Sequence, residues 1–356
     1  MPAAGWKNYA LKDDEANEAT SLTSDEFEDK VEESWYSCPV DRKTFKALIK
    51  RSDKIPAGYF GLWIFLLAAS GATAFATWGT WWAVPSFFVY GVLYSAADHR
   101  HHELSHGTPF KTRWINDAFF HVCAFLTLRE GFYYRWSHTR HHTHTSIVGK
   151  DPEIAAPRPP DVLCHVLDLF FLKDGFTQFR RLFRNASGDL AEAGKHFVPD
   201  SERGKVVAAS RVYLAVCAGV MVACYASASA LPAMFIVLPR FYGGPLSQLF
   251  NLTQHAGMNE DVYDHRLNTR TVIMNTSFSF LYANMNYHIE HHMFPMVPFY
   301  KLPELHKLIN ADCPPVYPSL WAAYREIVPA LLRQRRDPSW YVKRELPANA
   351  RGVIAA

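Results

Sequence analysis

The feature that most constrains this chain is a long run without charge. Between Ile55 and Ala97 there is no Lys, Arg, Asp or Glu. This run is about twice the ~20 apolar residues that cross a bilayer once. It therefore predicts a helical hairpin of two membrane spans. We expect the turn near Gly79 to Trp82, because clustered tryptophans suit the boundary between membrane and water.

A second apolar stretch runs from Val212 to Pro239 and continues to Thr253, with Arg240 as its single charged residue. It is also long enough for two crossings, with a turn expected near residues 227–232. A charge inside a span is costly, so Arg240 has a specific role. It either holds a substrate carboxylate or phosphate, snorkels to lipid headgroups or pairs with a neighbour.

The distribution of basic residues predicts the topology. Both expected turns lack Lys and Arg, whereas residues 1–54, 98–211 and 256–356 are rich in them. Positive charge favours the cytoplasmic side, which places the turns outside and the termini in the cytoplasm. The sequence thus predicts an all-α integral membrane protein with four transmembrane helices in two hairpins and a cytoplasmic helical cap. A soluble protein with two buried hairpins is the alternative.

Two further segments are shorter or more charged than a span. Residues 118–128 are apolar but too short to cross, which predicts an interfacial or re-entrant helix. Residues 162–183 alternate apolar and basic residues, a pattern typical of an amphipathic helix on the membrane surface. The net charge of +3 is too small to favour nucleic-acid binding.

Seventeen histidines are the outlier in composition, and many stand in three clusters that follow apolar segments. The clusters are HHELSH, WSHTRHHTHT and NYHIEHHMFP. On a helix, positions i, i+3 and i+4 share one face, so each cluster can present two or three imidazoles to one point. The clustered histidines are His102, His106, His138, His141, His142, His288, His291 and His292. We interpret five others as ordinary polar residues: His121, His165, His196, His265 and His306.

Eight or nine converging imidazoles predict more than one metal ion, because a structural zinc takes only four ligands. Imidazole suits iron, zinc, copper and nickel, and iron is the commonest of these in oxygen chemistry. A competing interpretation takes His102 to His106 as an H-E-x-x-H zinc site, with Glu103 as the general base of a membrane metalloprotease. That interpretation leaves both H-x-x-H-H clusters unexplained.

These motifs resemble the membrane fatty-acid desaturase superfamily, whose signature is H-x-x-x-H, then two H-x-x-H-H boxes separated by paired spans. The match runs from about Ile55 to Pro303. Asn251 and His255 are similar to an asparagine and histidine that the family carries before its third box, and Asp151-Pro152-Glu153 resembles its acidic segment after the second box. The resemblance implies nine iron ligands: His102, His106, His138, His141, His142, His255, His288, His291 and His292. It also implies that Asn251 holds a water on one iron.

By this resemblance the chain is an oxidoreductase of lipid metabolism. It uses two Fe ions and O₂ to introduce a carbon–carbon double bond, most commonly into a fatty acyl chain or lipid. Desaturation of a small metabolite, such as a dihydrorhizobitoxine-like amino acid, is an alternative. So is hydroxylation at the same site. Because the sequence carries no haem, rubredoxin or flavin motif, we expect electrons from a separate donor of ferredoxin, rubredoxin or cytochrome b5 type.

Three regions follow from this interpretation. Residues 1–54 form a cytoplasmic N-terminal segment, of which 1–34 are expected to be disordered; 55–303 form the membrane-embedded catalytic domain; and 304–356 form a cytoplasmic tail. Within the catalytic domain, three acidic residues are candidate partners for the N–H groups of ligand imidazoles. They are Asp98, Glu103 and Glu290.

Overall fold

The computed structural model describes residues 7–12, 35–348 and 350, and over these residues the fold is helical. It contains no strand among them; two isolated bridges join Thr271 to Tyr287 and Val272 to Tyr317. The N-terminal half comprises α2 (Arg42–Leu48), α3 (Lys54–Ala76), α4 (Ala83–Ser95), α5 (Ala97–Ser105), α6 (Arg113–Leu126), α7 (Gly131–Thr143), α8 (Val162–Asp168), α9 (Leu172–Ser187) and α10 (Glu192–Lys195). This confirms the all-α prediction.

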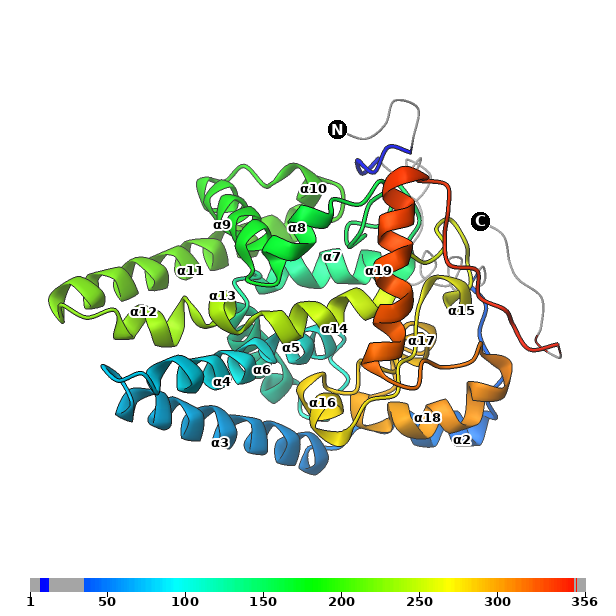
Figure 1. Cartoon of the computed structure of the whole chain (residues 1–356), viewed down its shortest axis with the longest axis horizontal. Coiled ribbons are helices and arrows are strands. Elements are labelled where there is room, and N and C mark those ends of the chain that lie inside the picture. Colours follow the sequence, from blue (N-terminus) through cyan, green and yellow to red (C-terminus); the bar gives the residue numbers. More distant parts are fainter. Residues whose placement is uncertain (1–6, 13–34, 349, 351–356) are drawn as a thin grey trace.

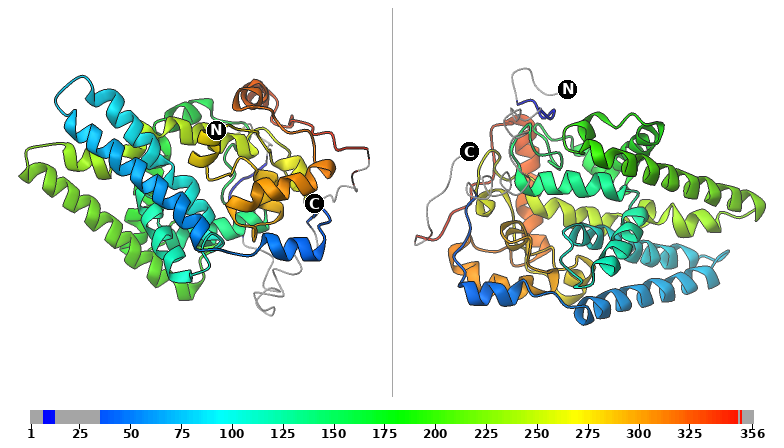
Figure 2. Two further views of the ribbon diagram at one scale, coloured as in Figure 1. Left: turned by 90° about the horizontal axis from the view of Figure 1, so that it is seen from below. Right: turned by 180° about the vertical axis from the view of Figure 1, so that it is seen from behind.

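The C-terminal half continues the helical arrangement. It comprises α11 (Asp200–Ala226), α12 (Leu231–Ile236), α13 (Pro239–Gly243), α14 (Pro245–His255), α15 (His265–Asn268), α16 (Thr276–Leu281), α17 (His288–Met293), η2 (Phe299–Lys301), α18 (Leu302–Ile309), η3 (Asn310–Asp312) and α19 (Leu320–Arg336). Figures 1 and 2 show α3, α4, α11 and α12 extending together from one end of the molecule, with α15 to α19 at the other end.

Within the segment expected to be disordered, residues 7–12 lie against the body of the protein. The backbone N–H of Lys12 donates to the carbonyl of Gly149, and the Tyr9 hydroxyl donates to Glu260 at 2.8 Å. These contacts differ from the disorder expected for residues 1–34. The remainder of that segment, 1–6 and 13–34, lies outside the described residues.

Two helices of the described chain, α3 and α11, are long and apolar enough to cross a membrane. In their most apolar stretches only 17% and 22% of the residues are buried inside the protein. A core helix of a soluble protein is mostly buried, whereas Phe65 and Met221 here leave 65% and 63% of their surface exposed. Length, composition and exposure together suit contact with lipid.

Both turns fall where the sequence places them. Helix α3 ends at Ala76 and α4 begins at Ala83, and α11 ends at Ala226 before α12 begins at Leu231. Trp81 and Trp82 in the first turn are 91% and 73% exposed. The returning limbs are not continuous long helices, however, so the four-span arrangement remains a prediction.

The second returning limb is broken into α12, α13 and α14 because Pro239 and Pro245 cannot donate a helical hydrogen bond. The missing N–H of Pro239 leaves the carbonyl of Phe235 without its helical partner, and the Tyr90 hydroxyl donates to that carbonyl at 2.9 Å. The Tyr94 hydroxyl donates to the next carbonyl, that of Ile236, at 2.5 Å. Helix α4 therefore satisfies the polar groups that the break releases, as an apolar environment requires.

The same pair of helices meets at two glycines. A Cβ atom added to Gly243 would lie 1.9 Å from the carbonyl carbon of Gly91. No side chain fits at such a separation, so the contact between α4 and α13 depends on glycine at both positions. This contact fixes where α14 starts and therefore where His255, at the end of α14, lies.

The amphipathic segment expected over 162–183 is found as two helices, α8 and α9. The chain turns between them at Phe171, whose φ is +53°. Phe176 and Phe183 on one side of α9 are 71% and 63% exposed, while Asp174 and Arg181 line a cavity inside the protein. The apolar residues expected at 118–128 belong mainly to α6, which packs against α5 and buries Phe120 and Cys123.

We predict that Gly243→Ala lowers the thermal stability of the protein in detergent, because the new methyl group collides with the backbone of Gly91. Overpacking of this kind costs about 1–3 kcal/mol. Gly219→Ala on α11 is the matched control, since a Cβ there meets nothing within 4 Å. Equal unfolding temperatures for the two variants would contradict the tight α4–α13 contact.

Candidate metal centre

Four helices bring the nine predicted ligands to the centre of the molecule. Helix α5 supplies His102 and is capped at its C-terminal end by His106, α14 ends at His255, and the remaining histidines lie on α7 and α17. The start of α7 is fixed by Glu130, whose carboxylate accepts hydrogen bonds from the backbone N–H groups of Phe132 and Tyr133. Each helix thus carries its histidines on the face that turns toward the others.

Eight of the histidines form two groups. Within each group, every residue offers one ring nitrogen that lies within 4.8 Å of those of the other members. The larger group contains His102, His106, His138, His142 and His291, and the smaller contains His141, His255 and His292. His288 belongs to neither group by this criterion, but its Nε2 lies 3.1 Å from the Nε2 of His292. The structure therefore brings all nine together and divides eight of them between two candidate metal positions.

Hydrogen bonds at Nδ1 orient several of these rings. The Nδ1 of His141 lies 2.9 Å from Asp151, that of His138 lies 3.0 Å from Glu153, and that of His255 lies 3.0 Å from the carbonyl oxygen of Asn268. A proton on Nδ1 that is donated outward leaves the Nε2 lone pair free to bind a metal. The Nε2 of His255 is buried without a hydrogen-bond partner, as expected of a ligand atom that faces an ion.

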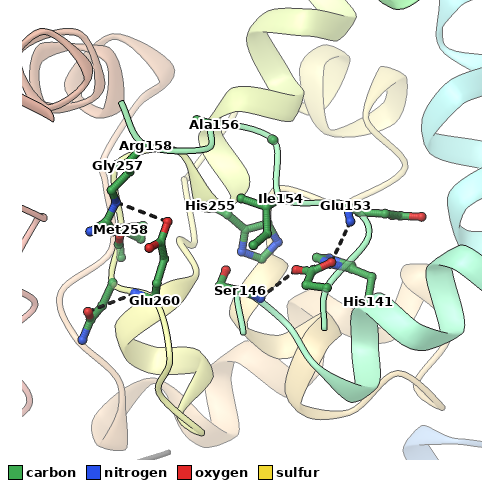
Figure 3. Close-up of a pocket in the computed structure, with 13 residues that line it drawn as sticks. His141, Ser146, Glu153, Ile154, Ala156, Arg158, His255, Gly257, Met258 and Glu260 are labelled. Atoms are coloured by element: carbon green, nitrogen blue, oxygen red, sulfur yellow. Dashed lines mark hydrogen bonds and ion pairs between the residues drawn. The ribbon is translucent and has the colours of Figure 1, made fainter. Parts of the chain in front are cut away.

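The loop after α7 supplies two of these acceptors. The Asp151 carboxylate accepts hydrogen bonds from the backbone N–H groups of Ser146 and Glu153, each at 2.7 Å. These bonds fix the position of the carboxylate beside His141. Figure 3 shows His141, Glu153 and His255 beside a small pocket, with Arg158 and Glu260 at its other side. From the sequence, this acidic segment was recognised only by its resemblance to the family, without a role. Its position directly after a histidine box was the available signal.

The three acidic partners expected from sequence have other contacts. Glu290 bonds to Thr271 at 2.6 Å and to His306 at 2.5 Å, so it faces away from the ligands. Glu103 accepts from Thr108 and from the backbone N–H of Phe299, and its second oxygen lies 3.8 Å from the Nδ1 of His291. Of the three, Glu103 alone approaches a ligand imidazole.

Asp98 bonds instead to Asn251, the residue expected to hold a water. The Asn251 amide N–H donates to Asp98 at 3.0 Å, and the buried guanidinium of Arg240 pairs with the same carboxylate at 2.7 Å. Burial opposes ionisation of Asp98, but Arg240 and Arg129 outweigh it and hold the pKa of the carboxyl well below its usual range. Arg240 is 3% exposed and paired with a neighbour, which agrees with one of the alternatives given for it.

Burial also determines the protonation of the ligand rings. Removal from water lowers the pKa of the His102, His138 and His291 side chains well below the ordinary value, so these rings are neutral. Burial also acts to lower the pKa of His141, but the carboxylate of Asp151 outweighs this effect, so the pKa of His141 is raised. Neutral imidazoles with acidic partners outside them form a donor set that suits divalent metal ions.

The same geometry argues against the single-zinc protease. His102 and His106 share their group with three further histidines from α7 and α17, which a single zinc site does not need. Glu103 is occupied by Thr108 and the backbone of Phe299, and burial raises its pKa to about 8. A neutral, hydrogen-bonded acid is a poor general base.

A cavity of about 590 Å³ lies against the two groups and is lined by His102, His141 and His255 among other residues. It extends between α7, α9 and α14 and includes the side chain of Asn251. A substrate that enters it reaches the histidines directly.

Comparison with known proteins agrees with the arrangement of the site. Residues 79–324, which contain all nine histidines, match the family model for fatty acid desaturases. A fatty acid conjugase of Calendula officinalis is 25% identical over 291 residues, covering 70% of this chain and 74% of that protein. A Delta(12) fatty acid dehydrogenase of Crepis alpina is 23% identical over 310 residues, covering 76% of this chain and 80% of that protein. With its family match over most of its length and its histidine groups around one centre, this chain belongs to the fatty acid desaturase family of oxidoreductases.

Proposed function

We propose that this protein is an O₂-dependent desaturase that introduces a carbon–carbon double bond into a fatty acyl substrate at a pair of histidine-bound iron ions. The observation that carries the proposal is the division of eight buried or half-buried histidines into two groups within one centre. Family membership and relatives described as a conjugase and a dehydrogenase of fatty acids support the acyl substrate.

The residues present fit two metal ions. The larger group would hold one ion through His102, His106, His138, His142 and His291, and the smaller would hold the other through His141, His255 and His292, with His288 adjacent. Bound iron would supply the capacity to activate O₂ and remove hydrogen from an unactivated carbon. The inward Nε2 lone pairs and the unpartnered Nε2 of His255 are the local evidence for that occupancy.

The chain itself positions the reacting groups. Asp151 and Glu153 fix the tautomers of His141 and His138, which keeps their Nε2 atoms directed inward. Asp98 accepts from the amide nitrogen of Asn251 and thereby leaves the amide oxygen available to hold water near the site. Such fixed positions matter because a displacement of about 1 Å in a reacting group can cost on the order of 10²-fold in rate.

The proposed topology has four crossings with the termini and the histidines in the cytoplasm. Helices α3 and α11 are the outward limbs, and the returning limbs are α4 and the broken segment from α12 to α14. The turns at residues 77–82 and 227–230 contain no Lys or Arg, which favours their placement outside. A separate electron-transfer protein of ferredoxin, rubredoxin or cytochrome b5 type would then reach the site from the cytoplasm.

The reaction is tested by comparing cells that express the protein with cells that express the His291→Ala variant. Mass spectrometry of lipids and polar metabolites should show a product lighter by two hydrogens in the first cells only. A product with one additional oxygen would identify hydroxylation at the same site. Identical profiles in cells that also contain a suitable electron donor would refute the proposed oxidation.

The purified protein should contain about two irons per chain, because nine imidazoles exceed what one ion binds. His291→Ala should lower the iron content and abolish oxidation. Asp151→Ala should weaken metal binding by about 10–100-fold, the usual effect of removing a hydrogen-bond partner of a ligand. His196→Ala, outside both groups, should keep the wild-type iron content in plasma emission measurements. A single zinc per chain that is indifferent to His291 would support the protease instead.

Cysteine labelling tests the topology in a background without native cysteines. Ser227→Cys in the second turn should react with a membrane-impermeant maleimide added from outside intact cells. Ser187→Cys at the end of α9 should react only after the cells are opened. Labelling of both positions from the same side would rule out the four-span arrangement.

A further inference from the structure

Helix α19 carries an exposed face that combines apolar and basic side chains. Its members follow one another at helical spacing and are all exposed: Trp321, Arg325, Val328, Leu332, Arg335 and Arg336. We call these six residues the α19 face. Trp321, Val328 and Leu332 are 71%, 48% and 50% exposed. Tryptophan and arginine are enriched in surfaces that bind other proteins, so the α19 face has the composition of such a surface.

The opposite side of α19 packs on α14, the helix that ends at His255. Ile327 belongs to the same apolar cluster as Leu252 of α14. The Gln334 side-chain amide donates to the carbonyl of Gly257, two residues beyond His255, at 3.2 Å. Figure 1 shows α19 crossing in front of α14. A partner on the α19 face is therefore separated from α14 by one helix, a thickness of about 10 Å.

The α19 face is positively charged. Arg325, Arg335 and Arg336 form no ion pair with a carboxylate within the described part of the chain. The single acid within the helix, Glu326, is already paired with Arg270 at 3.2 Å. An acidic partner would be attracted to this face and oriented by it. Because complexes of electron-transfer proteins bury less than about 1,200 Å² in total, an exposed helix can anchor one without a groove.

The proposed reaction requires more electrons than the substrate provides. Forming a double bond removes two electrons and two protons from the substrate, whereas reduction of O₂ to two waters takes four of each. Two electrons and two protons must therefore enter for each double bond. The sequence carries no haem, rubredoxin or flavin motif that would supply them. Building on the proposed desaturation, we propose that the α19 face docks an acidic electron-transfer protein, which is oxidised as it delivers these two electrons to the metal centre while water supplies the protons.

The position of α19 favours a protein partner over the bilayer. Figures 1 and 2 show α19 at the end of the molecule opposite the tips of α3 and α11, which is the cytoplasmic side in the proposed topology. Helix α9, which is also rich in arginine, differs. It packs against α11 and exposes Phe176 and Phe183, and its Arg184 pairs with Asp189 at 2.6 Å. Helix α9 therefore suits the membrane surface, whereas α19 suits a soluble partner.

The test measures electron transfer from two acidic carriers, a plant-type [2Fe–2S] ferredoxin and the soluble domain of cytochrome b5, to the iron-loaded full-length protein in lipid nanodiscs. Stopped-flow absorbance follows oxidation of the reduced carrier without O₂. At least one carrier should react, and Arg325→Glu with Arg336→Glu should lower its second-order rate constant by about five-fold or more at low ionic strength, because attraction becomes repulsion. Added salt should reduce this difference. Arg325→Gln with Arg336→Gln should give a smaller loss.

The matched control is Arg42→Glu with Lys46→Glu, which changes the charge equally on α2, where both residues are exposed. It should alter the rate constant less than about two-fold, because the carrier docks elsewhere and the effect of an exposed charge falls with distance. Reduction by dithionite, a small ion that needs no docking surface, should proceed equally in every variant. Unchanged iron content shows that the variants are folded.

Equal rate constants in wild type and the α19 variants overturn the inference, as do equal losses in the α19 and α2 variants or the absence of reaction with both carriers. So does lipid-like oxygen accessibility of a spin label at Leu332→Cys in discs without a carrier, which would assign the face to the bilayer. Product analysis separates this inference from the proposed function. If a carrier reduces the protein through the α19 face but neither lipid nor polar metabolite is oxidised, the proposed desaturation fails and the docking face stands.

Discussion

The structure depends on the convergence of nine imidazoles, all buried or half-buried, around one centre. Neutral rings converge most readily if each carries its proton on the side away from the others. For His141, His138 and His255 the acceptors of that proton are Asp151, Glu153 and the carbonyl of Asn268. The lone pairs that remain face one another, an arrangement that is costly unless cations occupy the space between them. The positions of helices α5, α7, α14 and α17 are therefore set by the metal ions that their histidines would share as well as by helix packing.

The sequence predicted what is encoded locally. An uncharged run of known length predicts a hairpin, and both turns lie at the expected residues. Histidines spaced three and four residues apart share a helical face, so the boxes at His138 and His288 could be assigned from spacing alone. The convergence of three distant boxes did not follow from spacing. We assumed that convergence from the number of clustered histidines, and the structure adds the convergence itself and the division into two groups.

What the sequence could not supply are contacts between residues far apart in the chain. Arg240 pairs with Asp98 across 142 positions, and no local pattern identifies that partner. Glu290 was a reasonable partner for a ligand by proximity in sequence, yet its carboxylate bonds to Thr271 and His306 because its helical face points away from the centre. The Gly91–Gly243 contact could not be predicted from the sequence either, because a glycine in an apolar helix does not by itself indicate a close contact or its partner.

The break in the second returning limb connects these observations. A continuous transmembrane helix that carried Gln248, Asn251 and Gln254 toward lipid would be unstable, because their amides would lack hydrogen bonds. Pro239 and Pro245 end the apolar part of the limb, and the tyrosines of α4 satisfy the carbonyls released there. Helix α14 then begins as a separate element that is free to turn its polar face inward. Asn251 in the middle of that face bonds to Asp98, and His255 at the end of α14 belongs to the metal centre. The break that separates α14 from the apolar part of the limb therefore accounts for both the polar face of this helix and the position of His255.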